Sequence, residues 1–214
     1  MPVFSFLRIS YFEFQIFPFG KRSPQSIRPF GNARMPLTKW KKLTEFIVSK
    51  NPWWTYRRDE FLLPNGKQGN YHYVHTLGSS LIVPVQPDGR IVLVNQYRYL
   101  RDKESIEFPC GGVKDGHSYD GTAVQELQEE AGYIARSWMV AGEFNPYNGV
   151  TDEICRVYVA RDLQPVPPKP DNTEEFEVIA LLPDEIDARI ISGVIWDGMS
   201  IAAWAIAKTY VRPL

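Results

Sequence analysis

Residues 110–133 of the chain read CGGVKDGHSYDGTAVQELQEEAGY, a glycine-rich segment followed by a segment with the features of a short helix. Glycines such as Gly111 and Gly112 let the backbone approach a ligand closely. Ser118 or Asp120 can cap the start of the helix, and Gly132 can end it as the residue that follows the last turn. The pattern predicts a loop that leads into a helix of about three turns.

Three carboxylates fall on one side of this predicted helix. Glu126, Glu129 and Glu130 are spaced i, i+3 and i+4, a spacing at which like charges repel each other. A divalent cation would reverse that repulsion, because hard cations such as Mg²⁺ bind a few carboxylates together with substrate phosphates. The cluster therefore suits metal-assisted hydrolysis of a phosphoanhydride. The alternative is a solvated acidic helix face, which is the usual meaning of clustered glutamates.

Length and composition limit the number of domains and the classes of partner. A chain of 214 residues with 44% hydrophobic residues fits one domain, or one domain with an appendage. Its 24 basic and 25 acidic residues nearly balance, so we expect neither nucleic acid nor membrane as a partner. The two cysteines, Cys110 and Cys155, do not resemble a disulfide framework, and we expect a cytoplasmic location.

Residues 1–34 differ from the rest of the chain, with many phenylalanines, five basic residues and one acid. Alternation near Phe14 is compatible with an edge strand. The basic composition is also typical of an organelle-targeting peptide. A third interpretation, which we favour, is that translation starts at Met35 and that the first stretch is an upstream extension. In each case we expect a poorly ordered segment.

Residues 35–78 are predicted to form an N-terminal helix and a β-hairpin. The basic residues around Trp40 are interpreted as a solvated helix end, and the segment 63–66 (Leu-Pro-Asn-Gly) as the hairpin turn. Trp54 and Tyr56, together with Trp53, are candidates for stacking on a nucleobase. The alternative is that these rings cover the face of the hairpin.

The remaining residues, 79–214, predict strands on both sides of the central helix and two helices near the end. The segments are strands at 80–85, 91–98, 106–109, 138–144, 152–160 and 174–182, and helices at 183–193 and 197–211. A proline-rich loop covers 163–173. This order indicates a mixed α/β layered domain and excludes a regular βαβ chain.

The spacing within 110–133 closely resembles the Nudix box, in which glycine, five residues, Glu and seven residues precede Arg-Glu-apolar-x-Glu-Glu-x-Gly-apolar. Counted from Gly111, two positions depart from that pattern. His117 stands where the family has Glu, and Gln125 stands where it has Arg. The matching residues are Gly111, Glu126, Leu127, Glu129, Glu130, Gly132 and Tyr133.

The resemblance extends to the ADP-ribose pyrophosphatase branch of that family through 96–98, 107–112 and 145–153, and it covers roughly Trp53 to Val211. It implies a Nudix α/β/α sandwich with a mixed sheet, preceded by a small N-terminal β element. Such an element is often used for dimerisation, so the resemblance also implies a homodimer.

The resemblance assigns roles to individual residues. Mg²⁺ or Mn²⁺ would be held by the box glutamates Glu126, Glu129 and Glu130 and by the backbone carbonyl of Cys110. Arg98 would contact the diphosphate. From the sequence itself, Glu107 is either a partner of a site residue or a residue of the site, and we favour the site because its strand ends at the glycine-rich segment. A base would come from the late loop, where Glu174 and Glu175 are the candidates. The implied reaction converts ADP-ribose to AMP and ribose 5-phosphate.

The two departures leave a rival function open. Gln125 can form hydrogen bonds but lacks the charge and the five donors of arginine. His117 would favour softer metal ions than a carboxylate does. One hypothesis is that the missing acid and base pair with each other in relatives and were lost as a unit. The rival is a catalytically weak module that binds or senses ADP-ribose. Tyr147 leaves room for dinucleoside polyphosphates as substrates.

Overall fold

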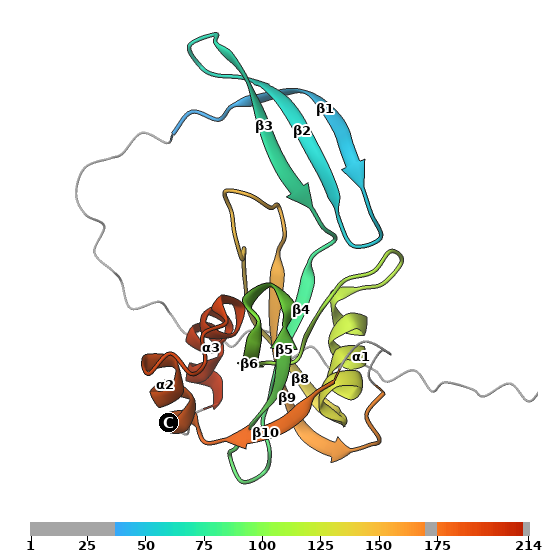
Figure 1. Cartoon of the computed structure of the whole chain (residues 1–214), viewed down its shortest axis with the longest axis vertical. Coiled ribbons are helices and arrows are strands. Elements are labelled where there is room, and N and C mark those ends of the chain that lie inside the picture. Colours follow the sequence, from blue (N-terminus) through green and yellow to red (C-terminus); the bar gives the residue numbers. More distant parts are fainter. Residues whose placement is uncertain (1–36, 170–174, 212–214) are drawn as a thin grey trace, which may run out of the picture.

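The computed structural model describes residues 37–169 and 175–211. The expectations for residues 1–34 and for Glu174 therefore lie outside the described residues. An N-terminal three-stranded sheet extends away from a body in which strands are flanked by helices (Figure 1). In the described part of the chain, no helix is long and apolar enough to cross a membrane.

The N-terminal sheet consists of β1 (Lys41–Lys50), β2 (Thr55–Leu62) and β3 (Gln68–His75) in that spatial order, with antiparallel pairing. The predicted hairpin is confirmed, and Gly66 occupies its turn with φ of 80°. The predicted N-terminal helix is wrong, because residues 41–50 form strand β1 instead. Thr44, Phe46, Ile47 and Val48 favour extended backbone, and pairing with β2 satisfies the backbone hydrogen bonds of that strand.

The body contains two further sheets. One has the order β10 (Glu177–Leu181), β5 (Ile91–Arg98), β6 (Lys103–Glu107), and a short 3₁₀ turn, η1 (Tyr99–Arg101), joins β5 to β6. The other has the order β7 (Cys110–Gly112), β4 (Ser79–Pro84), β9 (Cys155–Pro165), β8 (Tyr133–Phe144). Strands β4 and β9 run parallel and the other pairs are antiparallel, so the architecture is mixed, as predicted.

Consecutive residues of the central strands face two different hydrophobic cores. In β4, Leu81 and Val83 belong to one core, whereas Ile82 belongs to the other. In β5, Leu93 and Val94 divide in the same way. Because side chains alternate along a strand, runs that are apolar at every position require cover on both faces.

The helices supply that cover. Helix α1 (Tyr119–Ala131) packs Ala123 and Leu127 into one core. Helices α2 (Pro183–Ile191) and α3 (Gly198–Val211) pack Ile186 and Trp204 into the other, and they lie on the opposite side of the strands from α1 (Figure 1). The predicted α/β/α sandwich is confirmed.

Candidate functional site

The site is built where β6 ends, β7 passes and α1 begins. Ser118 caps α1 by accepting a hydrogen bond from the Gly121 backbone N–H at 3.0 Å. Gly132 ends the helix in the left-handed conformation, with φ of 68°. These caps fix the start and the end of the helix, and therefore the direction in which its glutamates project.

Each of the three glutamates has its own surroundings. Glu130 is buried and accepts a hydrogen bond from the Cys110 backbone N–H at 3.0 Å. Glu126 lies so close to β7 that a Cβ added to Gly111 would be 2.1 Å from its Oε1. The helix face thus packs directly against β7, and a side chain at position 111 would displace the Glu126 carboxylate.

Gln125 binds the third glutamate. Its Nε2 donates to Oε1 and Oε2 of Glu129 at 2.9 and 3.1 Å, one helical turn away. His117 is exposed in the loop before α1, and its backbone N–H donates to the Lys114 carbonyl at 3.0 Å. Glutamine can therefore orient a neighbouring box glutamate without a positive charge.

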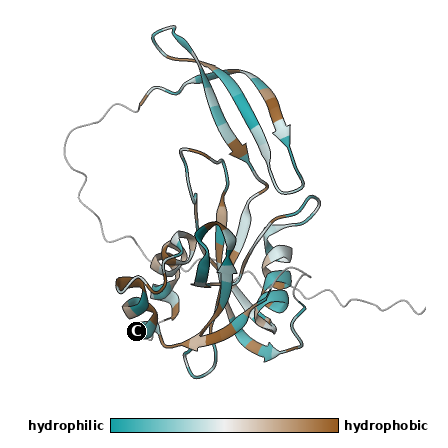
Figure 2. Cartoon of the chain, in the orientation of Figure 1, coloured by the Kyte–Doolittle hydropathy of each residue, from teal (hydrophilic) through white to brown (hydrophobic). Residues whose placement is uncertain are grey.

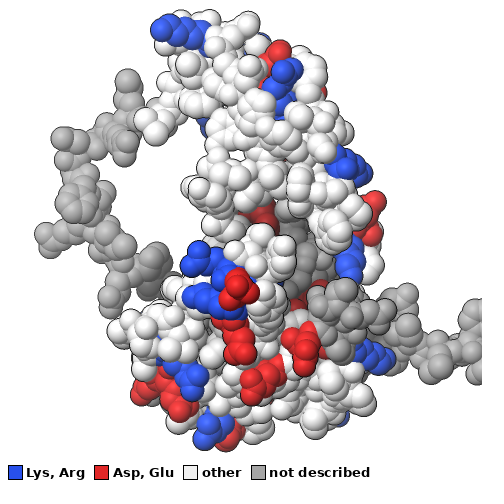
Figure 3. Space-filling model, in the orientation of Figure 1, with Lys and Arg blue, Asp and Glu red and all other residues white. Residues whose placement is uncertain are grey.

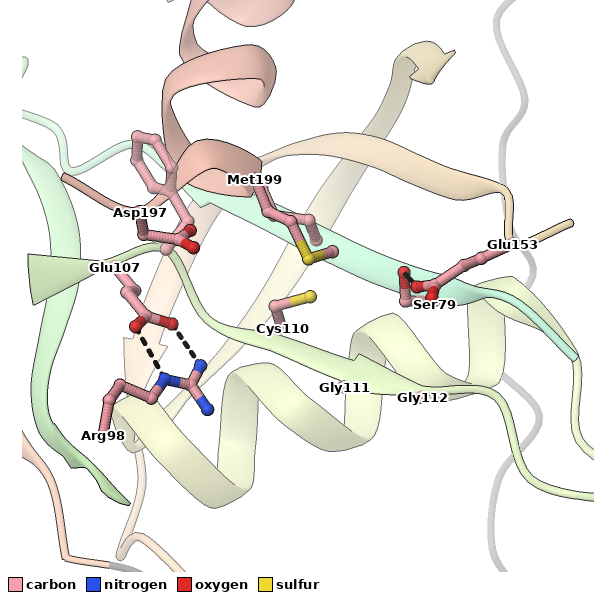
Figure 4. A pocket seen from close by; sticks show the side chains of 11 residues that line it. Ser79, Arg98, Glu107, Cys110, Gly111, Gly112, Glu153, Asp197 and Met199 are labelled. Atoms are coloured by element: carbon pink, nitrogen blue, oxygen red, sulfur yellow. Dashed lines mark hydrogen bonds and ion pairs between the residues drawn. The ribbon is translucent and has the colours of Figure 1, made fainter. Parts of the chain in front are cut away.

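Two cavities meet at the glycine loop. The larger one, of about 740 Å³, lies between the N-terminal sheet and the body and contains the side chains of Glu126, Glu129 and Glu130. The basic residues Lys50 and Lys114 also line it. A smaller pocket of about 220 Å³ lies beside β6 and the start of α3 (Figure 4). Its lining residues include Arg98, Glu107, Cys110, Asp197 and Met199.

An ion pair forms one wall of the smaller pocket. Nε of Arg98 donates to Oε1 of Glu107 at 2.7 Å, and Nη2 bonds the second carboxylate oxygen (Figure 4). Glu107 is buried, whereas the Arg98 side chain is 47% exposed. Hydrogen bonding to Glu107 raises the pKa of Arg98 above its ordinary value, so the guanidinium stays charged, and its exposed part can donate to an anion.

The donor atoms fit a hard divalent cation. Among residues 37–169 and 175–211, no three His, Cys, Asp or Glu side chains are grouped closely enough to hold one ion together. Mg²⁺, however, usually binds one or two carboxylates and completes its shell with waters and substrate phosphates. Three glutamates spread along one wall of an open cleft, next to the Cys110 backbone, suit that mode of binding.

The aromatic residues predicted to stack on a nucleobase lie in different surroundings. Trp54 lines the larger cavity with Trp53, and the turn that holds them is fixed by Asn51, whose Oδ1 accepts both of their backbone N–H groups at 2.9 Å. Tyr56 lines neither of the two cavities, and its hydroxyl bonds Nδ1 of His72 at 2.8 Å. The alternative interpretation of Tyr56 as a residue of the hairpin face thus describes its contacts better.

Of the two candidates for the base, the structure describes only Glu175, and it does not bring this residue to the site. Glu175 is exposed just before β10 and lines neither cavity. The walls of the smaller pocket instead contain two carboxylates without a sequence-based assignment, Glu153 and Asp197. Glu153 belongs to the stretch 145–153 that carries the family resemblance, so a signal for it was present. Asp197 lies between two helices, in a position that could have been assigned only as a helix cap.

Cys110 does not have the properties of a nucleophile. Contact with the Cys155 thiol, together with burial, raises the pKa of the Cys110 thiol well above its ordinary value. A protonated thiol is a poor nucleophile. The position thus contributes through its backbone, whose N–H already holds Glu130.

Two known protein families match the chain, one over the body and one over the N-terminal sheet. The NUDIX domain family matches residues 75–195, and the nucleoside diphosphate sugar hydrolase N-terminal domain family matches residues 40–74. The boundary between the two matches falls at the end of β3, where the N-terminal sheet joins the body.

Individual relatives share most of the chain. An ADP-ribose pyrophosphatase of Mycobacterium tuberculosis is 32% identical, over 68% of this chain and 72% of its own. An ADP-ribose pyrophosphatase of Bacillus subtilis is 29% identical, over 66% of this chain and 77% of its own. The crystal structure of an ADP compounds hydrolase superposes with a TM-score of 0.70 at 17% identity, covering 83% of this chain and 97% of that one.

Proposed function

Because the chain belongs to the Nudix hydrolase family, we propose that it hydrolyses a nucleoside diphosphate linked to another moiety, with ADP-ribose as the substrate. The products would be AMP and ribose 5-phosphate. Relatives named ADP-ribose pyrophosphatase and ADP-sugar pyrophosphatase support this choice. The observation that carries it is the pair of adjoining cavities, one lined by the box glutamates and the other by Arg98.

The arrangement suits a substrate with a diphosphate at its centre. Trp54 and Trp53 offer aromatic surface to a nucleobase in the larger cavity. Arg98 offers exposed N–H donors to phosphate oxygens in the smaller one. Both contacts orient the substrate, and orientation lowers the barrier by fixing the reacting atoms.

We propose Mg²⁺ or Mn²⁺ as the cofactor, with ligands drawn from Glu126, Glu129, Glu130 and the Cys110 carbonyl and one or two carboxylates on each ion. Such an ion would neutralise phosphate charge and lower the pKa of a bound water. The chain's own contribution is to hold the carboxylates in place. Cys110 does so through its backbone N–H to Glu130, and Gln125 does so through its amide to Glu129.

A second candidate is a module that binds ADP-ribose with little turnover. Its support is the pair of substitutions His117 and Gln125. The hydrogen bond from Gln125 to Glu129 favours the enzyme, because the glutamate keeps an orienting partner despite the loss of the arginine. Tyr147 is 66% exposed and lines neither cavity, so the structure adds no support for dinucleoside polyphosphates.

The test is a product assay with Mg²⁺ or Mn²⁺ over ADP-ribose, NADH, nucleotide sugars and dinucleoside polyphosphates. We expect ADP-ribose to give AMP and ribose 5-phosphate, EDTA to abolish the reaction, and Mg²⁺ to restore it. No turnover of any compound, together with tight binding of ADP-ribose in calorimetry, would instead establish the binding module.

We further propose a cytoplasmic homodimer. Both cysteines are free thiols, which suits a reducing compartment. Strand β1 is exposed along its whole length and carries an apolar band, visible in brown in Figure 2. On the face shown in Figure 3, acidic and basic side chains are interspersed, which supports small nucleotides rather than nucleic acid as ligands.

A further inference from the structure

Resting on the proposed function, we propose that Glu153 is the carboxylate that holds the attacking water and accepts its proton. Glu153 lies in the loop between β8 and β9. Among the described residues, it is the one carboxylate that lines both cavities. The other residues that the two linings share are Cys110, Gly111 and Gly112, which form strand β7.

This location is where a scissile diphosphate has to pass. The box glutamates line one cavity and Arg98 lines the other. A diphosphate that contacts both the box glutamates and Arg98 must cross strand β7, which lines both cavities. Glu153 and Ser79 lie at one end of the smaller pocket, and Arg98 and Glu107 lie at the other (Figure 4).

A buried hydroxyl orients the Glu153 carboxylate. Oγ of Ser79 donates to Oε1 of Glu153 at 2.6 Å, and Ser79 is only 4% exposed. No donor among the described residues bonds Oε2, so this oxygen can accept a hydrogen bond from water. The contact thus leaves one oxygen fixed and the other available.

The backbone of Glu153 is held as well. Nδ2 of Asn145 donates to the Glu153 carbonyl at 2.7 Å, and Oγ1 of Thr151 accepts the Glu153 N–H at 3.1 Å. The adjoining residue, Ile154, accepts the Ser79 backbone N–H at 3.0 Å. A general base needs this kind of placement, because proton transfer requires hydrogen-bond distance to the water.

The N-terminal sheet clamps the same loop. The Val74 N–H donates to the Val150 carbonyl at 2.8 Å, and Nδ1 of His75 lies 2.7 Å from Oδ2 of Asp152. Strand β3 therefore adds the loop to its edge. The N-terminal element positions Glu153 in addition to any part it takes in dimer formation.

The proposed step balances in atoms and electrons. The water oxygen forms a bond to one phosphorus, and the bond from that phosphorus to the bridging oxygen breaks. The electron pair of the broken bond stays on the leaving phosphate. One water proton goes to Oε2 of Glu153, which releases it to solvent after the products leave.

The experiment compares Glu153→Gln with wild type in ADP-ribose hydrolysis, monitored by AMP formation. Because loss of a general base costs about 10²- to 10⁴-fold, we expect kcat to fall by that factor with KM little changed. Ser79→Ala should lower kcat by a smaller factor, again without a change in KM. Mn²⁺ binding followed by electron paramagnetic resonance should remain as in wild type for both variants.

Glu143→Gln is the matched control. Glu143 is an exposed carboxylate on β8 that pairs with Arg156 and lines neither cavity, so its amide variant should keep wild-type kcat. Glu174→Gln and Glu175→Gln test the late loop in the same assay. Thermal melts establish that each variant is folded.

The outcomes separate the two proposals. If wild type turns over ADP-ribose and Glu153→Gln retains its kcat, the assignment of Glu153 is overturned while the proposed function stands. If kcat falls strongly only in Glu174→Gln or Glu175→Gln, the base lies in the late loop. The assignment of Glu153 is then overturned, while the proposed function stands. If wild type turns over none of the compounds, both proposals are overturned.

Discussion

Gln125 donates to both carboxylate oxygens of Glu129, a geometry that keeps one box glutamate oriented without an arginine. Gln125 still differs from the arginine of the family pattern in its lack of charge. Hydrogen bonds that involve an ionised group are roughly twice as strong as those between neutral groups. His117, the other departure, is exposed and lies eight positions earlier in the loop. The hypothesis that the two positions act as a unit is therefore testable directly.

We predict that His117→Glu and Gln125→Arg together increase kcat/KM by more than the product of their separate effects. An acid and a base that pair with each other stabilise the loop only when both are present, and a double-mutant cycle isolates that coupling. The four proteins are compared by AMP formation from ADP-ribose. Separate effects that multiply without any excess would contradict the hypothesis of a lost pair.

A substitution at Gly111 tests whether the close approach of Glu126 to β7 matters for metal binding. A Cβ at this position would lie 2.1 Å from Oε1 of Glu126, so Gly111→Ala must displace the carboxylate. We expect Mn²⁺ affinity and kcat to fall by about tenfold or more, since misplaced catalytic groups cost rate steeply.

The neighbouring glycine provides the comparison for Gly111→Ala. The nearest heavy atom to a Cβ at Gly112 is 4.0 Å away, so Gly112→Ala meets only ordinary van der Waals contact. Its effect on Mn²⁺ affinity should be much smaller. Equal losses in the two variants would show that the backbone of β7, rather than the approach of Glu126, sets the requirement for glycine.

At the level of elements, the central strands were predictable because they are short runs rich in β-branched residues, with a turn signal between them at 87–89. Residues 81–83 and 91–94 are apolar at every position, and the two cores explain why. Residues 41–50 were mispredicted because a short run such as Phe46-Ile47-Val48 does not distinguish helix from strand by itself. Pairing with β2 makes this segment a strand. The partner residues are distant in sequence: Thr44 and Glu60, whose side chains are hydrogen-bonded, are 16 residues apart.

Some residues of the candidate site were likewise predictable from the sequence, and others were not. The glutamates of α1 were predictable because their spacing lies within one helix. The role of Glu153 depends on Ser79, which is 74 residues away, and on a strand pairing that no local pattern reports. Tyr56 was assigned from residue type and Glu175 from a loop that matches the family, and in the structure neither residue lines the two cavities.

The ion pair between Arg98 and Glu107 connects the ends of β5 and β6 and should contribute to stability. Replacing Arg98 by Met leaves the buried Glu107 carboxylate with one side-chain donor among the described residues, the amide of Gln96 at 3.4 Å. We expect the free energy of unfolding in urea to fall by about 1–3 kcal/mol, a range discounted for the exposure of Arg98.

Arg156→Met is the matched variant for that measurement. Its Nη2 lies 2.7 Å from Oε1 of Glu143, but this carboxylate is 45% exposed and can be hydrated when the arginine is lost. We expect a change of about 0–1 kcal/mol. Similar losses in the two variants would mean that burial of Glu107 adds nothing to the cost.

At the scale of the whole molecule, the N-terminal sheet has exposed apolar surface that the body does not cover. Ile47 and Val48 are 63% and 52% exposed, and β1 is also an edge of the sheet. An uncovered apolar edge strand favours pairing with another chain. The clamp between β3 and the loop at 145–153 fixes this sheet to the body, so its exposed surface is held in a defined place.

We predict that the chain is a dimer in solution and that Ile47→Glu dissociates it. A carboxylate placed in an apolar interface without a partner is costly to desolvate. Light scattering at micromolar concentrations should give about twice 24.6 kDa for wild type and one chain mass for the variant. Leu100→Glu, a change at a 93% exposed residue of η1, should leave the mass of the dimer unchanged. A wild-type protein with the mass of one chain, or a dimer that persists in Ile47→Glu but is lost in Leu100→Glu, would place the interface elsewhere or remove it.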